Sequence, residues 1–247
     1  MVAVLIAGVA AGAINAVVGS GTLITFPTLI AFGVAPVTAN VSNTIGLVPG
    51  VVSGIVGYRR ELSGQRARAI RLGSASLIGG VIGAVLLLSL PAGAFKAIVP
   101  VLILLGLLLV VLQPRISAWV DARHEGAREE NGPRWVWPAV LLTGVYGGYF
   151  GAAQGVLLMG ILGIGIADTL QRLNGLKQVL AGLVNGVAGV IFIVVAHVDW
   201  KVVALIAVGS VIGGQIGATV GRRLSPLALR VFIVVVGLAA LVTFVVR

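Results

Sequence analysis

The stretch of sequence that decides the fold is residues 12–33, GAINAVVGSGTLITFPTLIAFG. An apolar run leads into it, the triplet Gly19-Ser20-Gly21 interrupts that run, and a short apolar segment, 22–33, follows. At about 1.5 Å per residue, the short segment reaches under ~20 Å as a helix, whereas the hydrocarbon core of a bilayer is ~30 Å thick. We therefore expect this segment to be a broken, tilted or re-entrant element inside a membrane.

The composition around this stretch supports a membrane setting. Of the 247 residues, 59% are hydrophobic and 10% are charged, which is too little polar surface to cover a water-soluble globule. Residues 1–18 carry no Lys or Arg, so we expect a retained span here and no signal peptide. The apolar stretches lie at 2–19, 22–33, 37–58, 70–90, 94–112, 136–152, 155–167, 177–196, 201–221 and 226–246.

The two halves of the chain share a pattern of glycines at an offset of 132 residues. A second block, GGVIGA at 79–84, matches GGQIGA at 213–218 after a slip of two residues, and a duplicated half explains both better than biased composition. We predict an all-α integral membrane protein of two inverted repeats with about five hydrophobic segments each, one of them short and broken or re-entrant. The predicted domains are 1–112 (first transmembrane repeat), 113–135 (cytoplasmic linker) and 136–247 (second transmembrane repeat). The paired glycines are Gly12 with Gly144, Gly19 with Gly151, Gly33 with Gly165, Gly50 with Gly182, Gly54 with Gly186 and Gly57 with Gly189.

The basic residues indicate the orientation, because short cytoplasmic loops concentrate Lys and Arg. If the short segments cross the membrane, each half has five crossings, the halves are inverted, and the 17 basic residues divide 14 to 3 in favour of the cytoplasm. If the short segments return, each half has four crossings, the halves run parallel, and the division is 11 to 6. We favour the inverted arrangement, with both termini outside.

Several functions are disfavoured by what the chain lacks. It has no cysteine and two histidines, which gives no thiolate or multi-histidine metal site, and we predict neither a metal nor a cofactor. All seven acidic residues can be placed in loops or at span ends, so a carboxylate sodium site, a proton relay and an intramembrane enzyme are disfavoured. The net charge of +10 lies in short loops and predicts no nucleic-acid partner.

Polar side chains near the interrupted helices are the candidate substrate-binding residues. A helix break leaves backbone N–H groups unpaired, and together with hydroxyl and amide donors these make a cradle for an anion. In the first half the candidates are Asn15, Gly19, Ser20, Gly21, Thr22, Asn40, Asn43 and Ser53. In the second half they are Gly151, Gln154, Asn174, Lys177 and Asn185.

Each candidate also has a structural interpretation. Asn15, Ser20 and Asn43 are equally suited to capping backbone groups at the breaks. The Lys177 side chain could either attract an anion or snorkel to the lipid headgroups, and for Arg172 we expect snorkelling. The glycine ladder at Gly209, Gly213, Gly217 and Gly221 favours helix packing over substrate contact. The segment 197–201 (HVDWK) suits a membrane-edge loop better than a proton pair.

Several of these motifs together resemble the sulfite exporter TauE/SafE family of bacterial membrane proteins. The resemblance is carried by GAIN at 12–15 running into GSGTLI at 19–24, by GGYFG at 147–151, and by VDW at 198–200 followed by the glycines of 213–217. It implies transport of sulfite, sulfonates or related organosulfur and organic acids across the bacterial cytoplasmic membrane. The second half departs from the first, because Gly151-Ala152-Ala153-Gln154-Gly155 replaces the glycine-rich break and no proline follows at the place of Pro27.

We therefore predict a multi-pass secondary transporter that moves a small anion by alternating access. A passive anion channel is the alternative, since the same residues suit either. The expected partners are the anionic substrate and the lipid bilayer, and a homodimer is left open.

Overall fold

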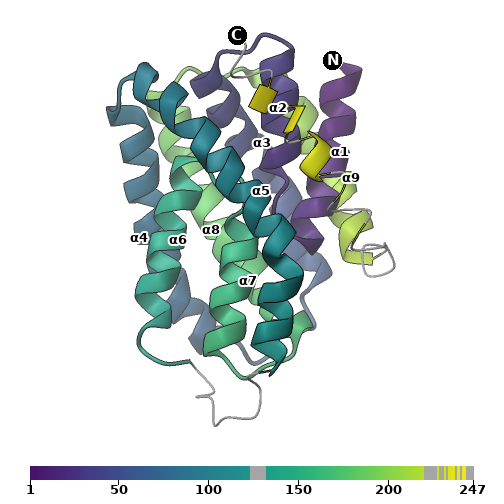
Figure 1. Ribbon diagram of the computed structural model, residues 1–247, viewed down its shortest axis with the longest axis vertical. Coiled ribbons are helices and arrows are strands. Elements are labelled where there is room, and N and C mark those ends of the chain that lie inside the picture. The colour runs from purple at the N-terminus through teal and green to yellow at the C-terminus, as the bar shows by residue number, and fades with distance from the viewer. Residues whose placement is uncertain are drawn as a thin grey trace.

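A computed structural model of the chain describes residues 1–122, 132–219 and scattered positions between 227 and 242. In these ranges the regular elements are helices, as the apolar runs predict (Figure 1). Most of the predicted last span, 226–246, lies outside the described residues. The helices are α1 (Val2–Val17), α2 (Thr22–Ala31), α3 (Pro36–Gly57), α4 (Arg66–Ser89), α5 (Ala92–Ala122), α6 (Val136–Tyr149), α7 (Gln154–Gly165), α8 (Leu170–Val195) and α9 (Trp200–Thr219).

Five of the described helices are long and apolar enough to cross a membrane, namely α3, α4, α8, α9 and the segment Gly93–Leu112 of α5. An α-helix satisfies the hydrogen bonds of its backbone within itself, and the core of a bilayer offers no water to satisfy them otherwise. Two bounds differ from the prediction by more than four residues. Helix α8 begins at Leu170 and not at 177, and α5 continues to Ala122, into the stretch expected to be the linker.

The short helices are the return arms of two hairpins. The end of α7 lies against the start of α6, since a Cβ atom at Gly165 would touch the side chains of Val136 and Trp135. Helix α2 likewise returns toward the end where the chain begins, while α7 lies at the opposite end (Figure 1). Each short segment therefore runs back alongside the helix before it, a geometry that the count of five crossings in each half did not include. A run such as 2–19 is almost long enough to span, so its length alone did not reveal the hairpin.

Two helix breaks, 18–21 between α1 and α2 and 150–153 between α6 and α7, have the same backbone geometry at the 132-residue offset. Gly19 and Gly151 both adopt positive φ, 85° and 69°. The amide of Gly19 donates to the Ile14 carbonyl and that of Gly151 to the Tyr146 carbonyl, each at 3.0 Å. Left-handed φ at the end of a helix is accessible to glycine at low cost, which explains a glycine at both positions.

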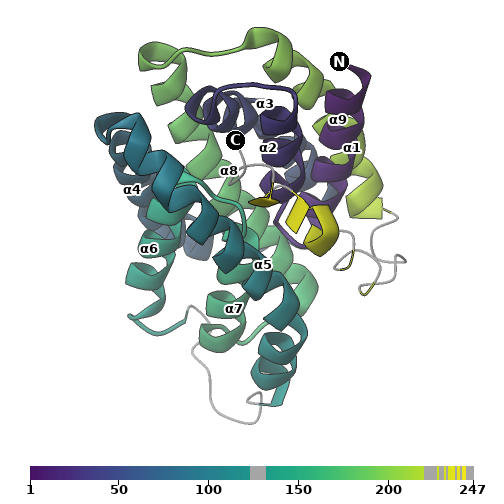
Figure 2. The same ribbon diagram turned by 45° about the horizontal axis from the view of Figure 1, so that its top comes forward.

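The hairpins pack against helices from the other half of the chain. Helix α1 packs along α9 and α6 along α4, while α3 and α8 lie between them (Figures 1 and 2). Both contacts are made through glycine faces: a Cβ at Gly213 would meet the Val9 carbonyl, and one at Gly83 would meet the Val145 carbonyl. Small residues let helix backbones approach closely in a membrane, so the packing interpretation of the Gly209–Gly217 ladder agrees with these contacts.

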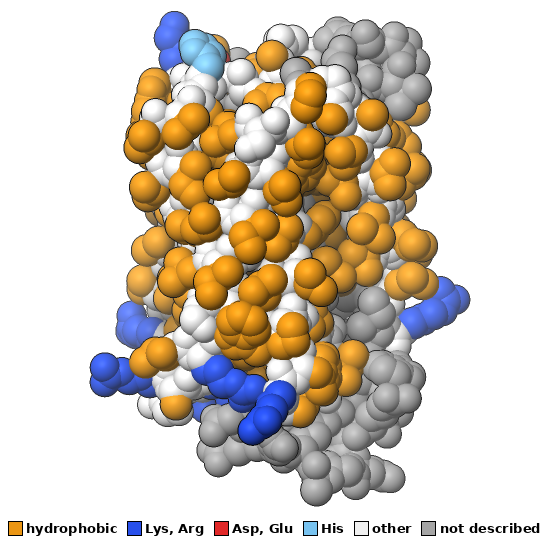
Figure 3. Space-filling model, turned by 90° about the vertical axis from the view of Figure 1, so that its left-hand side faces the viewer, with side chains coloured by type: hydrophobic (Ala, Val, Ile, Leu, Met, Phe, Trp, Pro, Cys, Tyr) orange, Lys and Arg blue, Asp and Glu red, His pale blue; other side chains and the backbone are white. Residues whose placement is uncertain are grey.

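The surface divides into an apolar band and a basic end. Figure 3 shows hydrophobic side chains around the middle of the molecule and Lys and Arg gathered mainly at one end. Arg59, Arg60, Arg66 and Arg134 are exposed at the end of α3 and the starts of α4 and α6. These helix termini lie together, since Arg71 of α4 donates to the Gly132 carbonyl before α6, and we call this the basic end. The opposite end carries the loop 197–199 and the first turn of α9, where His197, Trp200 and Lys201 are exposed, Trp200 to 57%.

Candidate functional site

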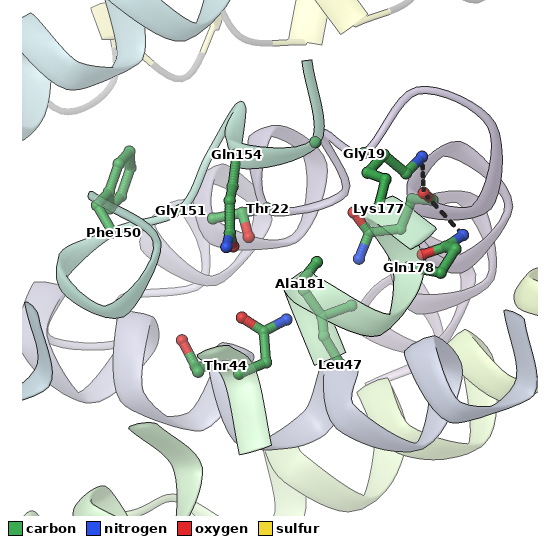
Figure 4. A pocket seen from close by; sticks show the side chains of 13 residues that line it. Gly19, Thr22, Thr44, Leu47, Phe150, Gly151, Gln154, Lys177, Gln178 and Ala181 are labelled. Carbon is green, nitrogen blue, oxygen red and sulfur yellow. Dashed lines mark hydrogen bonds between the residues drawn. The ribbon is translucent and has the colours of Figure 1, made fainter. Parts of the chain in front are cut away.

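A small, mostly enclosed cavity lies where the two helix breaks, 18–21 and 150–153, meet α3 and α8 (Figure 4). Its volume of about 20 Å³ is close to what one water molecule needs. Any anion with several heavy atoms requires a wider cavity than this state has. The lining residues are Asn15, Gly19, Thr22, Thr44, Leu47, Phe150, Gly151, Gln154, Gly155, Lys177, Gln178, Ala181 and Asn185.

Seven of the predicted site residues line this cavity: Asn15, Gly19, Thr22, Gly151, Gln154, Lys177 and Asn185. They come from both breaks and from α8. The predicted set left out the other six lining residues: Thr44, Leu47, Phe150, Gly155, Gln178 and Ala181. Ala181 lies midway between Lys177 and Asn185 at helical spacing, which is a signal that could have found it. Leu47 and Phe150 are apolar residues among many others, and nothing in their sequence context singles them out.

Lys177 is the only charged side chain among the described residues that line the cavity. Its side chain is fully buried, and Nζ donates to the carbonyl oxygen of Asn15 at 3.4 Å (Figure 4). The ion pairs found among the described residues both involve Asp168, so neither neutralises Lys177. The snorkelling interpretation of Lys177 is therefore wrong, because its ammonium group is directed into the protein. A buried charge of this kind needs a counter-charge or several hydrogen-bond partners.

Two side-chain amides of α8, those of Asn174 and Gln178, donate hydrogen bonds to carbonyl groups in the last turn of α1. The last carbonyls of a helix lack partners within the helix and must find them elsewhere. Asn174 Nδ2 donates to the Ala16 carbonyl at 3.2 Å and to the Tyr58 hydroxyl at 2.7 Å. Gln178 Nε2 donates to the Ala16 carbonyl at 3.1 Å. Asn174 thus caps a broken helix and does not line the cavity, unlike the predicted role.

A side chain of α3 caps the helix end at the second break, as the side chains of α8 do at the first. Asn40 Nδ2 donates to the carbonyl of Tyr149, the last residue of α6, at 2.9 Å. Asn43 donates to the Thr22 hydroxyl at 3.2 Å and accepts from the Thr25 hydroxyl, which ties α2 to α3. Asn40 and Asn43 lie outside the cavity lining, so their capping interpretation describes their contacts.

Three further candidates lie outside the lining. The amide of Gly21 donates to Asn15 Oδ1 at 3.2 Å, so Asn15 both caps the break and faces the cavity. Ser20 is fully buried and its hydroxyl has no hydrogen-bond partner. Ser53 donates to the Val211 carbonyl at 3.2 Å and accepts from Gln215 Nε2 at 2.8 Å, which joins α3 to α9.

An ion-pair cluster lies at the basic end, between the start of α4 and the loop before α8. Asp168 pairs with Arg68 at 2.7 Å and with Arg172 at 2.8 Å. Partial burial alone would raise the pKa of the Asp168 carboxyl, but hydrogen bonds from the two guanidinium groups outweigh it and lower that pKa below its usual value. Arg172 therefore binds a protein carboxylate, in contrast to its predicted snorkelling. Among the described residues no group of three or more His, Asp or Glu side chains could hold a metal ion.

The fold and the cavity define a class: an all-α, multi-pass membrane protein with a mostly enclosed polar cavity. Residues 4–244 match the protein family described as Sulfite exporter TauE/SafE. The chain therefore belongs to the sulfite exporter TauE/SafE family.

Curated relatives agree with this assignment. The chain is 27% identical over 237 residues to a probable membrane transporter protein, ORF9, of Sinorhizobium sp, with 95% of this chain and 88% of that protein covered. It is 24% identical over 232 residues to the probable membrane transporter protein YfcA of Escherichia coli strain K12, covering 92% and 82%. A probable membrane transporter protein of Haemophilus influenzae is 24% identical over 219 residues, covering 85% and 81%. No solved structure matches the chain. The protein is thus a membrane transporter.

Proposed function

We propose that the protein is a secondary transporter that moves a small anion across the bacterial cytoplasmic membrane by alternating access. The observation that carries this proposal is Lys177, a fully buried cation without a carboxylate partner among the described residues, facing a cavity between two helix breaks. A bound anion would supply the counter-charge that the site lacks. No carboxylate lines the described part of the cavity, so a cationic substrate would meet only repulsion from Lys177.

The substrate proposed is sulfite, a sulfonate or a related organosulfur or organic acid. The description of the matching family names sulfite export. The Lys177 ammonium group and the side-chain amide of Gln154, at the start of α7, both line the cavity and can donate hydrogen bonds. These donors suit the oxygen atoms of such anions.

Alternating access is the proposed mechanism because the cavity is mostly enclosed and too small for the anion. It has room for about one water molecule, so loading an anion requires the surrounding elements to move apart. The two breaks touch where the amide of Gly155 donates to the carbonyl of Gly19 at 3.1 Å. We place the moving boundary between the halves at this contact, with the two halves related as inverted repeats.

The proposed orientation has the basic end in the cytoplasm. In the first half this leaves one hairpin, α1 with α2, and three crossings by α3, α4 and α5. An odd number of crossings brings the chain to the cytoplasmic side before α6, and the hairpin α6–α7 then enters from there. The second half therefore starts on the opposite side of the membrane from the first, so the halves are inverted. Any odd number of crossings, three or five, gives this result.

Uptake by purified protein in liposomes tests the proposal. Sulfite, methanesulfonate, sulfate and acetate are supplied outside, with and without a proton gradient, and uptake is compared with protein-free vesicles. A carrier predicts saturable uptake that is accelerated by the same anion inside, which is counter-flow. Ohmic single-channel currents would identify a passive anion channel instead, and uptake of none of these anions would contradict the proposal.

A further inference from the structure

The side-chain amide of Gln154 faces the cavity with an unused hydrogen-bond donor. Gln154 is 3% exposed, and its Nε2 atom has no hydrogen-bond partner. Figure 4 shows the side chain extending from the start of α7 into the cavity, toward Thr22. A buried donor without a partner costs free energy, about 1–3 kcal/mol. A ligand that accepts a hydrogen bond at this place would remove that cost.

Gly147 makes room for this amide. A Cβ atom at Gly147 would lie 2.5 Å from Cδ, 2.6 Å from Oε1 and 2.7 Å from Nε2 of Gln154. In the first half, 132 residues earlier, the position of Gly147 is held by Asn15 and that of Gln154 by Thr22. Each helix break therefore presents one carboxamide to the cavity, Asn15 from before the first break and Gln154 from after the second, and α8 adds those of Gln178 and Asn185. The amide of Asn15 accepts from the Gly21 amide, whereas Gln154 Nε2 is unused.

When Lys177 is protonated, the side chains around the cavity carry one positive charge. Lys177 is the one charged side chain of the described lining. Two helix starts, at Thr22 and Gln154, and two helix ends, at Val17 and Tyr149, border the breaks. Their dipole charges are about +0.5 and −0.5 each and therefore nearly cancel. One net positive charge balances a monovalent anion, and a dianion would leave a buried negative charge uncompensated.

We propose that Gln154 is a specificity-determining residue, which together with Lys177 selects monovalent oxyanions over monatomic anions and over dianions. This inference rests on the proposed anion transport. Lys177 supplies the charge and binds one oxygen atom, while Gln154 Nε2 donates to a second oxygen of the same anion. A chloride ion offers both donors the same single centre, whereas an oxyanion offers a separate oxygen atom to each of the two side chains, which lie on different sides of the cavity (Figure 4). Gly147 acts as a positioning residue, because its missing side chain leaves the space that the amide occupies.

Uptake into liposomes of four probe anions tests the inference: formate and methanesulfonate as monovalent oxyanions, chloride, and sulfate as a dianion. Wild-type protein should prefer at least one monovalent oxyanion over chloride and sulfate. Gln154→Leu should reduce uptake of that oxyanion about 10- to 100-fold, the loss expected for one hydrogen bond to a charged group. Gln154→Glu keeps the shape but replaces the donor by an acceptor with a negative charge, and it should abolish oxyanion uptake.

Two further variants separate selectivity from general damage. Gly147→Ala should displace the amide and lower the oxyanion-to-chloride ratio without removing Gln154. Gln215→Leu makes the same chemical change at a glutamine that bonds Ser53 outside the cavity, and it should leave that ratio unchanged. Size-exclusion chromatography checks that each variant is folded, and the ratio of two anions is insensitive to the amount of active protein.

The outcomes distinguish this inference from the proposed function. Wild-type uptake of an oxyanion with an unchanged anion preference in folded Gln154→Leu and Gln154→Glu overturns the role of Gln154 and leaves anion transport standing. Faster wild-type uptake of sulfate than of either monovalent oxyanion overturns the charge argument. Absence of wild-type uptake of all four probes overturns both.

Discussion

The backbone amide of Gly155 donates a hydrogen bond of 3.1 Å to the carbonyl of Gly19, so the two helix breaks touch at the edge of the cavity. The contact is close enough that a Cβ at either glycine would collide with the backbone of the other. Residues 136 positions apart thus hold the two hairpins together, and a motion that separates the hairpins has to break this contact.

Gly19→Ala is predicted to destabilise the protein through both strain and collision. Gly19 has φ of 85°, where an alanine costs about 1–2 kcal/mol, and the new Cβ would also strike Gly155. Gly33→Ala is the matched control, because Gly33 has φ of 82° but open space where its Cβ would lie. Thermal unfolding in detergent should show a larger drop in Tm for Gly19→Ala than for Gly33→Ala. Equal drops would mean that the contact between the breaks contributes nothing.

Gly213→Ala is predicted to loosen the packing of α1 on α9. The added Cβ would meet the Val9 carbonyl and lie 2.8 Å from the Ala13 amide nitrogen, so the helices must separate. Gly186→Ala is the control, since that glycine lies inside α8 with no atom within 4 Å of the added Cβ. Alanine favours a helix by up to about 1 kcal/mol over glycine, so the control should hold or raise Tm. A Gly213→Ala protein as stable as wild type would refute the close packing.

Asp168→Asn is predicted to lower stability near neutral pH, because both ion pairs at the basic end are lost. The pKa of Asp168 is lowered in the folded protein, so its contribution is present above the ordinary Asp pKa of about 3.9 and is lost as pH falls through the lowered value. Tm of wild type and variant should therefore differ at pH 7 and converge as the pH is lowered below about 4. A difference that persists unchanged into acid would contradict the ion-pair explanation.

The proposed orientation predicts the labelling of introduced cysteines, which is direct because the chain has none of its own. Ser63→Cys lies in the exposed loop after α3 at the basic end, and His197→Cys lies in the exposed loop before α9. In intact cells a membrane-impermeant thiol reagent should label position 197 and should reach position 63 only after permeabilisation. The reverse pattern would place the basic end outside.

Several site residues could be predicted because each stands out from its immediate neighbours in the sequence. The glycines at 19 and 151 mark both breaks, and Lys177 is conspicuous as a cation among apolar residues. What the sequence could not supply was the rotation of each helix. Asn40 and Asn185 are polar residues on long helices, yet the first caps Tyr149 and the second faces the cavity. That difference depends on which neighbours surround each helix.

The arginine ion pairs and the hairpins also depend on contacts between segments that are far apart in the sequence. Asp168 and Arg172 are four residues apart and could have been paired by helical spacing, but Arg68 reaches the same carboxylate from 100 residues away. The helical nature of 2–19 follows from its composition, whereas its role as one arm of a hairpin depends on the turn at Gly19 and on packing against α9. Length alone favoured a crossing for this run.

The central claim is that Lys177 binds the transported anion, and replacing it with methionine tests this most directly. Lys177→Met keeps the length and apolar stem of the side chain but removes the charge from the cavity. Lys201→Met makes the same change at an exposed lysine in the first turn of α9. Initial rates of anion uptake into liposomes should fall by about tenfold or more in Lys177→Met and stay at the wild-type level in Lys201→Met. Wild-type uptake by a folded Lys177→Met protein would contradict the account.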